Sequence, residues 1–255
     1  MRMDEIEWNN QGNSVRVGMT WHGQGELVLM LPALSSISTR MEMWPLQERL
    51  GSFFTTLTMD WVGFGDRPRP PWRWSPEIYR SFLACLLNEV VPWPFATIAA
   101  GHAAAYCLDA AAARPGSTGR LCLIAPTWRG PLPTMMGRKH PMLAQISRMV
   151  DWRPSLSSKR QSLHGTEDGA WPRIRRVKLT FRSSIRGEAG GDAQVNDLIM
   201  VVYGAETPPR SRAEIEALAG LPNVVAAVVA HAKLAVHEEF PDEVATTIKK
   251  FLLGA

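Results

Sequence analysis

Two histidines close to the C-terminal end of the chain are the clearest candidates for acid–base chemistry. His231 follows an apolar run, Val224–Val229, and His237 precedes an amphipathic segment. An imidazole readily takes up and returns a proton near neutral pH, so either residue could act as a general base on water or on a substrate. Histidines at the ends of strands and helices are also common as ordinary surface residues, and the sequence leaves both interpretations open.

A second polar group follows another apolar run, in the segment LPALSSISTR. We single out Ser35 and Arg40 because a hydroxyl and a guanidinium side by side could bind a carboxylate or a phosphate. The same residues could equally form hydrogen bonds within their own loop.

The composition indicates one domain over residues 1–255. The chain has 45% hydrophobic residues, enough for one sizeable core, and its net charge of +4 does not indicate a nucleic-acid partner. Three scattered cysteines lack the spacing of a metal site or of a disulfide framework, so we expect reduced thiols, a cytoplasmic location, no metal and no other cofactor. The acidic N-terminal residues do not resemble a secretory signal, and we see no apolar run of about 18 residues that would span a membrane.

Short apolar runs alternate with helix-like segments along most of the chain. This alternation is typical of an α/β fold with a mostly parallel central sheet flanked by helices. The predicted strands are Val15–Trp21, Glu26–Leu31, Phe53–Met59, Ala96–Ala99, Leu121–Ile124, Leu198–Val202 and Val224–Val229. The predicted helices are Glu77–Val91, Ala103–Ala113 and Asp242–Leu253.

The alternation is interrupted at about residues 131–197, which we predict to be an inserted lid because the stretch is longer than a normal connection. From Arg138 to Arg186 it carries twelve Lys or Arg and three acidic residues, an excess of nine positive charges. The basic lid could be a solvated amphipathic element. It could also contact an anionic group of a ligand or a partner, or an anionic lipid surface.

Three stretches, in this order, resemble the α/β-hydrolase superfamily. They are FTTLTMDWVGFGDRP from Phe54 to Pro68, TIAAGHAAAYCLDAAAA from Thr97 to Ala113, and the C-terminal LIMVVYGAETP with VVAAVVAHAKLAVHEEFPDEVATTIKKFL. The resemblance implies an α/β-hydrolase fold with a lid between the sixth and seventh strands. It also implies that the second stretch holds the nucleophile and that the third delivers the catalytic acid and histidine.

The resemblance places alanine at the nucleophile position. Matching Gly-x-Ser-x-Gly to residues 101–105 puts Ala103 where the serine would stand, and a methyl group has no nucleophilic atom. The oxyanion hole would then be formed by the backbone N–H of Ala104 and by that of Ala33 or Leu34.

The positions of the acid and the histidine also depart from the family pattern. The acid position falls on Thr207, and the only carboxylate beside it is Glu206. The histidine position falls on Leu234, three residues from both His231 and His237. Either imidazole could still serve as a base if the loop has a different shape.

These departures favour a hydrolase-like protein that lacks serine-hydrolase activity. We expect it to bind a medium-sized apolar or acyl-type ligand with an anionic group, in a pocket lined by Ser35, Arg40 and Trp128. One alternative is a lyase or isomerase that needs no cofactor and uses a histidine base. Another is an active hydrolase, or an esterase whose serine was replaced by engineering at Ala103.

Overall fold

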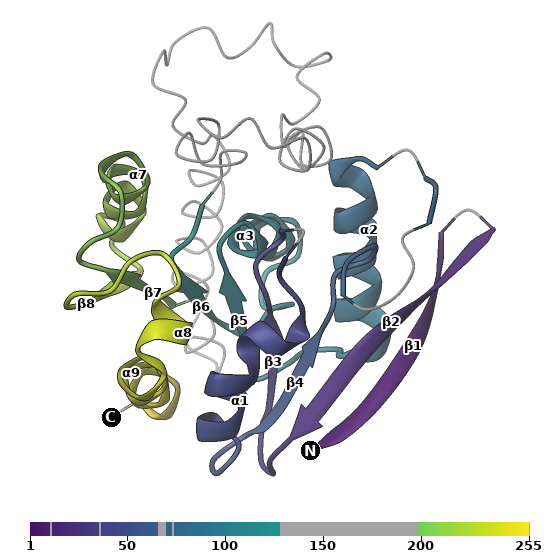
Figure 1. Cartoon of the computed structure of the whole chain (residues 1–255), viewed down its shortest axis with the longest axis horizontal. Helices are drawn as coiled ribbons and strands as arrows, with labels where there is room; N and C mark the ends of the chain where they lie inside the picture. Colours follow the sequence, from purple (N-terminus) through teal and green to yellow (C-terminus); the bar gives the residue numbers. More distant parts are fainter. Residues whose placement is uncertain (11, 36, 66–69, 73, 128–197, 255) are drawn as a thin grey trace, which may run out of the picture.

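The fold is a single mixed sheet with helices on both faces. A computed structural model describes residues 1–10, 12–35, 37–65, 70–72, 74–127 and 198–254. The described residues form eight strands in the order β1-β2-β4-β3-β5-β6-β7-β8 (Figure 1). All neighbours from β4 to β8 pair in parallel, and β2 pairs antiparallel with both β1 and β4. This is the mostly parallel α/β sheet that the alternation of apolar runs predicts.

The bounds of the elements agree closely with the predicted strands. The strands are β1 Arg2–Asn10, β2 Asn13–His22, β3 Leu27–Leu31, β4 Thr55–Met59, β5 Ala96–Ala100, β6 Arg120–Ile124, β7 Ile199–Gly204 and β8 Val224–Val229. The helices are α1 Trp44–Leu50, α2 Pro76–Cys85, α3 Ala103–Ala113, α7 Pro209–Ala219, α8 Val236–Glu239 and α9 Pro241–Leu253. A 3₁₀ turn, η1 Arg40–Met43, precedes α1, and a π-helical turn, η2 Leu86–Val90, extends α2.

Alternating side chains of the buried strands divide the core into two layers. In β3, Leu29 and Leu31 pack on the layer that α2, α3 and α7 cover, whereas Val28 and Met30 pack on the layer that α1, α8 and α9 cover. Successive strand residues point to opposite faces, so a strand covered on both sides must be apolar at nearly every position. This explains why the central strands are readable as continuous apolar runs.

The elements missing from the sequence prediction have weak apolar patterns. Only Trp8 is buried in β1, because this strand is paired on one side and most of its side chains face solvent. In α1 the apolar pattern is short and follows Pro45 in the first turn. The predicted lid at residues 131–197 lies outside the described residues. No helix in the described parts of the chain is long and apolar enough to cross a membrane.

Parallel pairing brings the loops that carry the candidate residues to one edge of the sheet. The loops after β3, β5, β6, β7 and β8 all leave from carboxyl ends of neighbouring strands. Ligands of open α/β sheets bind at this edge. The loop after β3 and the turn after β5 are therefore neighbours in space, although about 70 residues separate them in sequence.

Candidate functional site

The turn from β5 into α3 is centred on Gly101. Its backbone has φ +51°, in the left-handed region that favours glycine. Gly101 N–H donates to the Ile124 carbonyl at 2.9 Å, and the Gly101 carbonyl accepts from Thr127 N–H at 3.1 Å. A Cβ on Gly101 would lie 3.2 Å from the Cβ of Ala33. A side chain at position 101 would thus face the loop after β3.

Ala103 lies two residues beyond this turn. It is the first residue of α3, is 0% exposed and belongs to the core layer under α2 and α3. Ala104 is equally buried, and its N–H donates to the Gly101 carbonyl at 3.3 Å. A strained strand-to-helix turn presents the nucleophile in enzymes of this kind. In this structure the residue of the turn with positive φ is Gly101, two residues before Ala103.

The backbone donor predicted in the loop after β3 is already engaged. Ala33 N–H donates to Oε1 of Glu42 at 3.1 Å. Leu34, the other predicted donor, is buried. The hydroxyls of Ser35 and Ser38 are 2.8 Å apart and form a hydrogen bond within the loop. Ser35 thus contributes to the loop's own structure.

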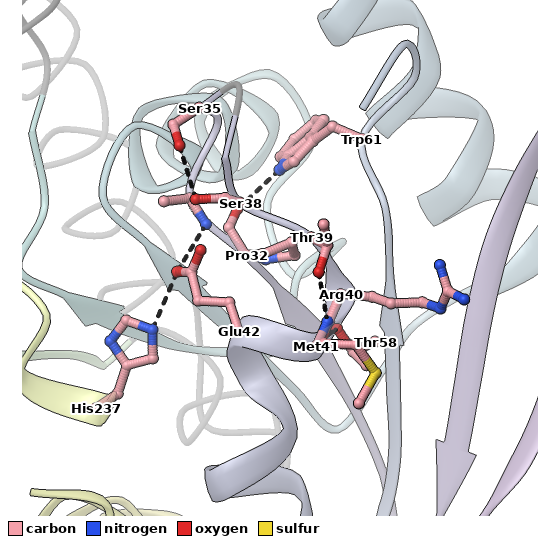
Figure 2. A network of polar contacts seen from close by, with 11 residues as sticks. Pro32, Ser35, Ser38, Thr39, Arg40, Met41, Glu42, Thr58, Trp61 and His237 are labelled. Carbon is pink, nitrogen blue, oxygen red and sulfur yellow. Dashed lines mark hydrogen bonds and ion pairs between the residues drawn. The ribbon is translucent and has the colours of Figure 1, made fainter. Parts of the chain in front are cut away.

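The same oxygen of Glu42 contacts His237. The distance from Oε1 to Nε2 is 3.0 Å, and the two side chains are 9% and 5% exposed respectively (Figure 2). The residues are 195 positions apart, one in η1 and the other in α8. A buried carboxylate–imidazole pair therefore lies beside the backbone donor of Ala33.

Glu42 is ionised at neutral pH. Burial alone would raise the pKa of this carboxyl, but the hydrogen bond and the charge of His237 outweigh it, with smaller contributions from Ser38 and the Ala33 N–H, so the net pKa lies below its ordinary value. An ionised carboxylate only accepts hydrogen bonds, so Nε2 of His237 must be the donor. Nδ1 of His237 is buried and has no hydrogen-bond partner among the described residues.

In the structure His237 contacts Glu42, whereas the predicted acid, Glu206, lies near His231. Nδ1 of His231 and Oε1 of Glu206 are 3.8 Å apart, and the two side chains are 87% and 51% exposed. Both residues therefore lie at the solvent-exposed surface. The sequence analysis missed Glu42, since it lies in another part of the chain and belongs to no local motif with His237.

Neither of the other two positions taken from the family pattern carries an ionisable group. Thr207 is buried, and its N–H donates to the Gly204 carbonyl at 3.1 Å. Leu234 is partly buried and packs on the core layer of α8 and α9. Glycine is required at 204, because a Cβ there would lie 2.1 Å from the carbonyl oxygen of Ala232. Neither loop therefore has an ionisable side chain at the position that the resemblance assigns to the acid or to the histidine.

Arg40 is held by Asp60 at the end of β4. Its N–H donates to Oδ1 of Asp60 at 2.7 Å and its guanidinium donates to the other carboxylate oxygen, with both side chains largely buried. This ion pair fixes the loop after β3 onto the sheet. Trp128, the third predicted pocket residue, lies outside the described residues.

One group of side chains in the described parts of the chain could hold a metal ion. It consists of Glu42, His237 and Glu238, whose potential ligand atoms lie within 4.8 Å of one another. The pKa of Glu238 is raised, mainly by burial and also by the neighbouring Glu42 and Glu239 carboxylates.

Comparison with known proteins points to one family. A family model described as "Alpha/beta hydrolase family" matches residues 21–247. No curated protein matches the sequence.

Several solved structures have the same fold. A haloalkane dehalogenase from Agrobacterium tumefaciens superposes with a TM-score of 0.67 at 14% identity, covering 98% of this chain and 96% of that chain. A thermophilic esterase from Thermogutta terrifontis, solved with malate bound, gives 0.65 at 14% identity, covering 100% of this chain and 99% of that chain. A serine hydrolase involved in carbazole degradation gives 0.62 at 13% identity and full coverage of both chains. At these identities the likeness concerns the fold.

Proposed function

The chain belongs to the α/β-hydrolase family, and within that family we propose that it is a member without serine-hydrolase activity that binds a medium-sized apolar ligand. One observation carries this proposal. The strained turn after β5 has glycine where a nucleophile would stand, so no oxygen or sulfur atom is available for attack at Gly101.

The remaining positions of the catalytic machinery support the same conclusion. The acid position holds Thr207 and the histidine position holds Leu234. In addition, the Ala33 N–H already donates to Glu42, where a developing oxyanion would need an unoccupied donor. An acyl transfer without a nucleophile, and without an acid and a histidine at their usual positions, lacks the groups that carry out its covalent step.

The alternative hypothesis, an esterase whose serine at position 103 was replaced by engineering, explains fewer of these observations. Ala103 is fully buried in the core. A serine at this position would therefore have its hydroxyl group in the core, beneath the turn. The changes at Thr207 and Leu234 would also remain without explanation.

The anionic group that we expect on the ligand depends on the basic charges between Arg138 and Arg186, which lie outside the described residues. A cytoplasmic location also belongs to the proposal, and the three free cysteines support it, because thiols persist in a reducing compartment.

The test of the catalytic part combines active-site labelling with ester hydrolysis. We expect the wild-type chain to resist a fluorophosphonate probe and to hydrolyse p-nitrophenyl butyrate no faster than the Gly101→Ala variant. Gly101→Ser should also stay unlabelled, as should Ala103→Ser, the matched control in the core, because a serine at either position would still lack the catalytic acid and histidine. Labelling of Gly101→Ser would contradict this part of the proposal.

Wild-type labelling by the probe would refute the proposal. Wild-type hydrolysis that resists the probe and is lost in His237→Gln would instead favour an enzyme with a histidine base. The buried Nδ1 of His237, which has no partner among the described residues, is the observation that keeps this second function in view.

The ligand part is tested by thermal stabilisation. Because a ligand stabilises the native state by mass action, octanoate at a concentration above its dissociation constant should raise the melting temperature more than octanol does. Equal shifts would remove the anionic group from the proposal, and the absence of any shift with either compound would count against a ligand of this class.

A further inference from the structure

Three potential metal ligands converge beside the backbone donor of Ala33. Glu42 comes from η1, and His237 and Glu238 come from α8. One ligand atom from each lies within 4.8 Å of the other two. Ligands about 2.0 to 2.2 Å from a zinc ion lie roughly 3.3 Å from one another, so the 3.0 Å separation of Glu42 Oε1 from His237 Nε2 is already close to that spacing.

The group has more negative charge than its described surroundings compensate. Glu42 is paired with His237, and its remaining partners are neutral: the Ala33 N–H and Ser38. The carboxylate of Glu238 makes no hydrogen bond or ion pair with any described residue, although it lies near Glu42. No lysine or arginine among the described residues forms an ion pair with either carboxylate.

His237 is the buried member of the group and has an unused ring nitrogen. Its Nδ1 is buried and has no hydrogen-bond partner among the described residues. A buried polar atom without a partner costs about 1 to 3 kcal/mol. Either ring nitrogen of a neutral imidazole can coordinate a metal. An ion held by Nδ1 would offset this cost, whereas an ion held by Nε2 would replace the hydrogen bond to Glu42.

We propose that Glu42, His237 and Glu238 form a binding site for one divalent transition-metal ion of the Zn²⁺ type. The imidazole selects against Mg²⁺ and Ca²⁺, which prefer oxygen ligands throughout. Two carboxylates with one imidazole supply three ligands, and a fourth position would be left for water or for a ligand of the protein.

The experiment is a calorimetric titration of the untagged full-length protein after removal of metals with EDTA. Zn²⁺ should bind with one site per chain and more tightly than Mg²⁺. Glu238→Gln should weaken Zn²⁺ binding by about 10- to 100-fold or more, since even an outer-shell change has an effect of this size. The matched control is Glu239→Gln, because Glu239 is the next residue of α8 and its carboxylate accepts from Lys233 N–H at 3.0 Å, outside the group.

A second measurement covers the case in which His237→Gln fails to fold. In long-range ¹H–¹⁵N spectra of the wild-type protein, Zn²⁺ should shift the ring nitrogens of His237 and leave those of the exposed His231 unchanged. The proposal is overturned if Zn²⁺ does not saturate, if it binds no more tightly than Mg²⁺, or if Glu238→Gln and Glu239→Gln bind equally well.

Discussion

Replacement of Glu42 by alanine should destabilise the protein strongly, although the residue lies in a short 3₁₀ turn. The substitution removes the hydrogen-bond acceptor of both Ala33 N–H and His237 Nε2. His237 would then be a buried imidazole with no partner at either nitrogen among the described residues. Removing one partner of a buried pair costs about 3 to 5 kcal/mol.

We expect a destabilisation at the lower end of this range, because removing the Glu42 carboxylate also removes the desolvation cost of burying its charge. A destabilisation of about 3 kcal/mol lowers the melting temperature of a chain of this size by roughly 6 to 12 °C. The assay is urea and thermal unfolding of Glu42→Ala, His237→Ala and the double variant. The cycle should give a coupling energy of about 1.5 to 3 kcal/mol, as expected for a hydrogen bond to a charged group.

The matched control is the exposed pair of the same residue types, Glu206 and His231. Its atoms are 3.8 Å apart at the surface, so the corresponding cycle should give about 0.5 kcal/mol or less. Similar coupling energies for the two pairs would refute the assignment of Glu42 and His237 as a buried, structurally important pair.

Three further predictions concern the same edge of the sheet. Gly101→Ala should cost about 1 to 2 kcal/mol in unfolding free energy, because an L-residue would have to adopt φ +51°; an unchanged melting temperature would contradict this. Gly204→Ala should reduce soluble expression or stability far more, because its Cβ would overlap the Ala232 carbonyl oxygen at 2.1 Å. Since the pKa of Glu42 is lowered on folding, its contribution to stability is present above about pH 4.5 and is lost as the pH falls through the folded-state pKa, so in urea unfolding at a series of pH values the free energy of unfolding should fall less steeply below about pH 4.5 in Glu42→Gln than in the wild type. The raised pKa of the neighbouring Glu238 acts in the opposite direction, and for this reason the comparison should be repeated in Glu238→Gln.

Most of the sheet could be predicted from the sequence, because strands that are buried on both faces need an apolar residue at almost every position. β8 begins and ends at the predicted residues, Val224 and Val229, and α3 also matches its prediction. β1 was missed for the complementary reason. Its side chains are mostly exposed, so the strand has no apolar pattern and depends on its pairing with β2.

The site was less predictable because its members meet only in three dimensions. His237 was a candidate on its residue type alone, but its partner Glu42 comes from the other end of the chain. The position of the turn at Gly101 depends on where β5 ends, and a difference of two residues changes which side chain would face the loop after β3. The spacing of glycines defines the turn only approximately.

The hydrogen bond from Ala33 to Glu42 also bears on inhibitors. Boronates and phosphonates bind hydrolases by placing an anionic oxygen at such a backbone donor. Here a tethered carboxylate occupies the donor at an effective concentration that a soluble anion must exceed in order to displace it. Glu42 therefore competes with such inhibitors for the Ala33 N–H. Compounds selected for oxyanion binding in related enzymes should bind this protein weakly.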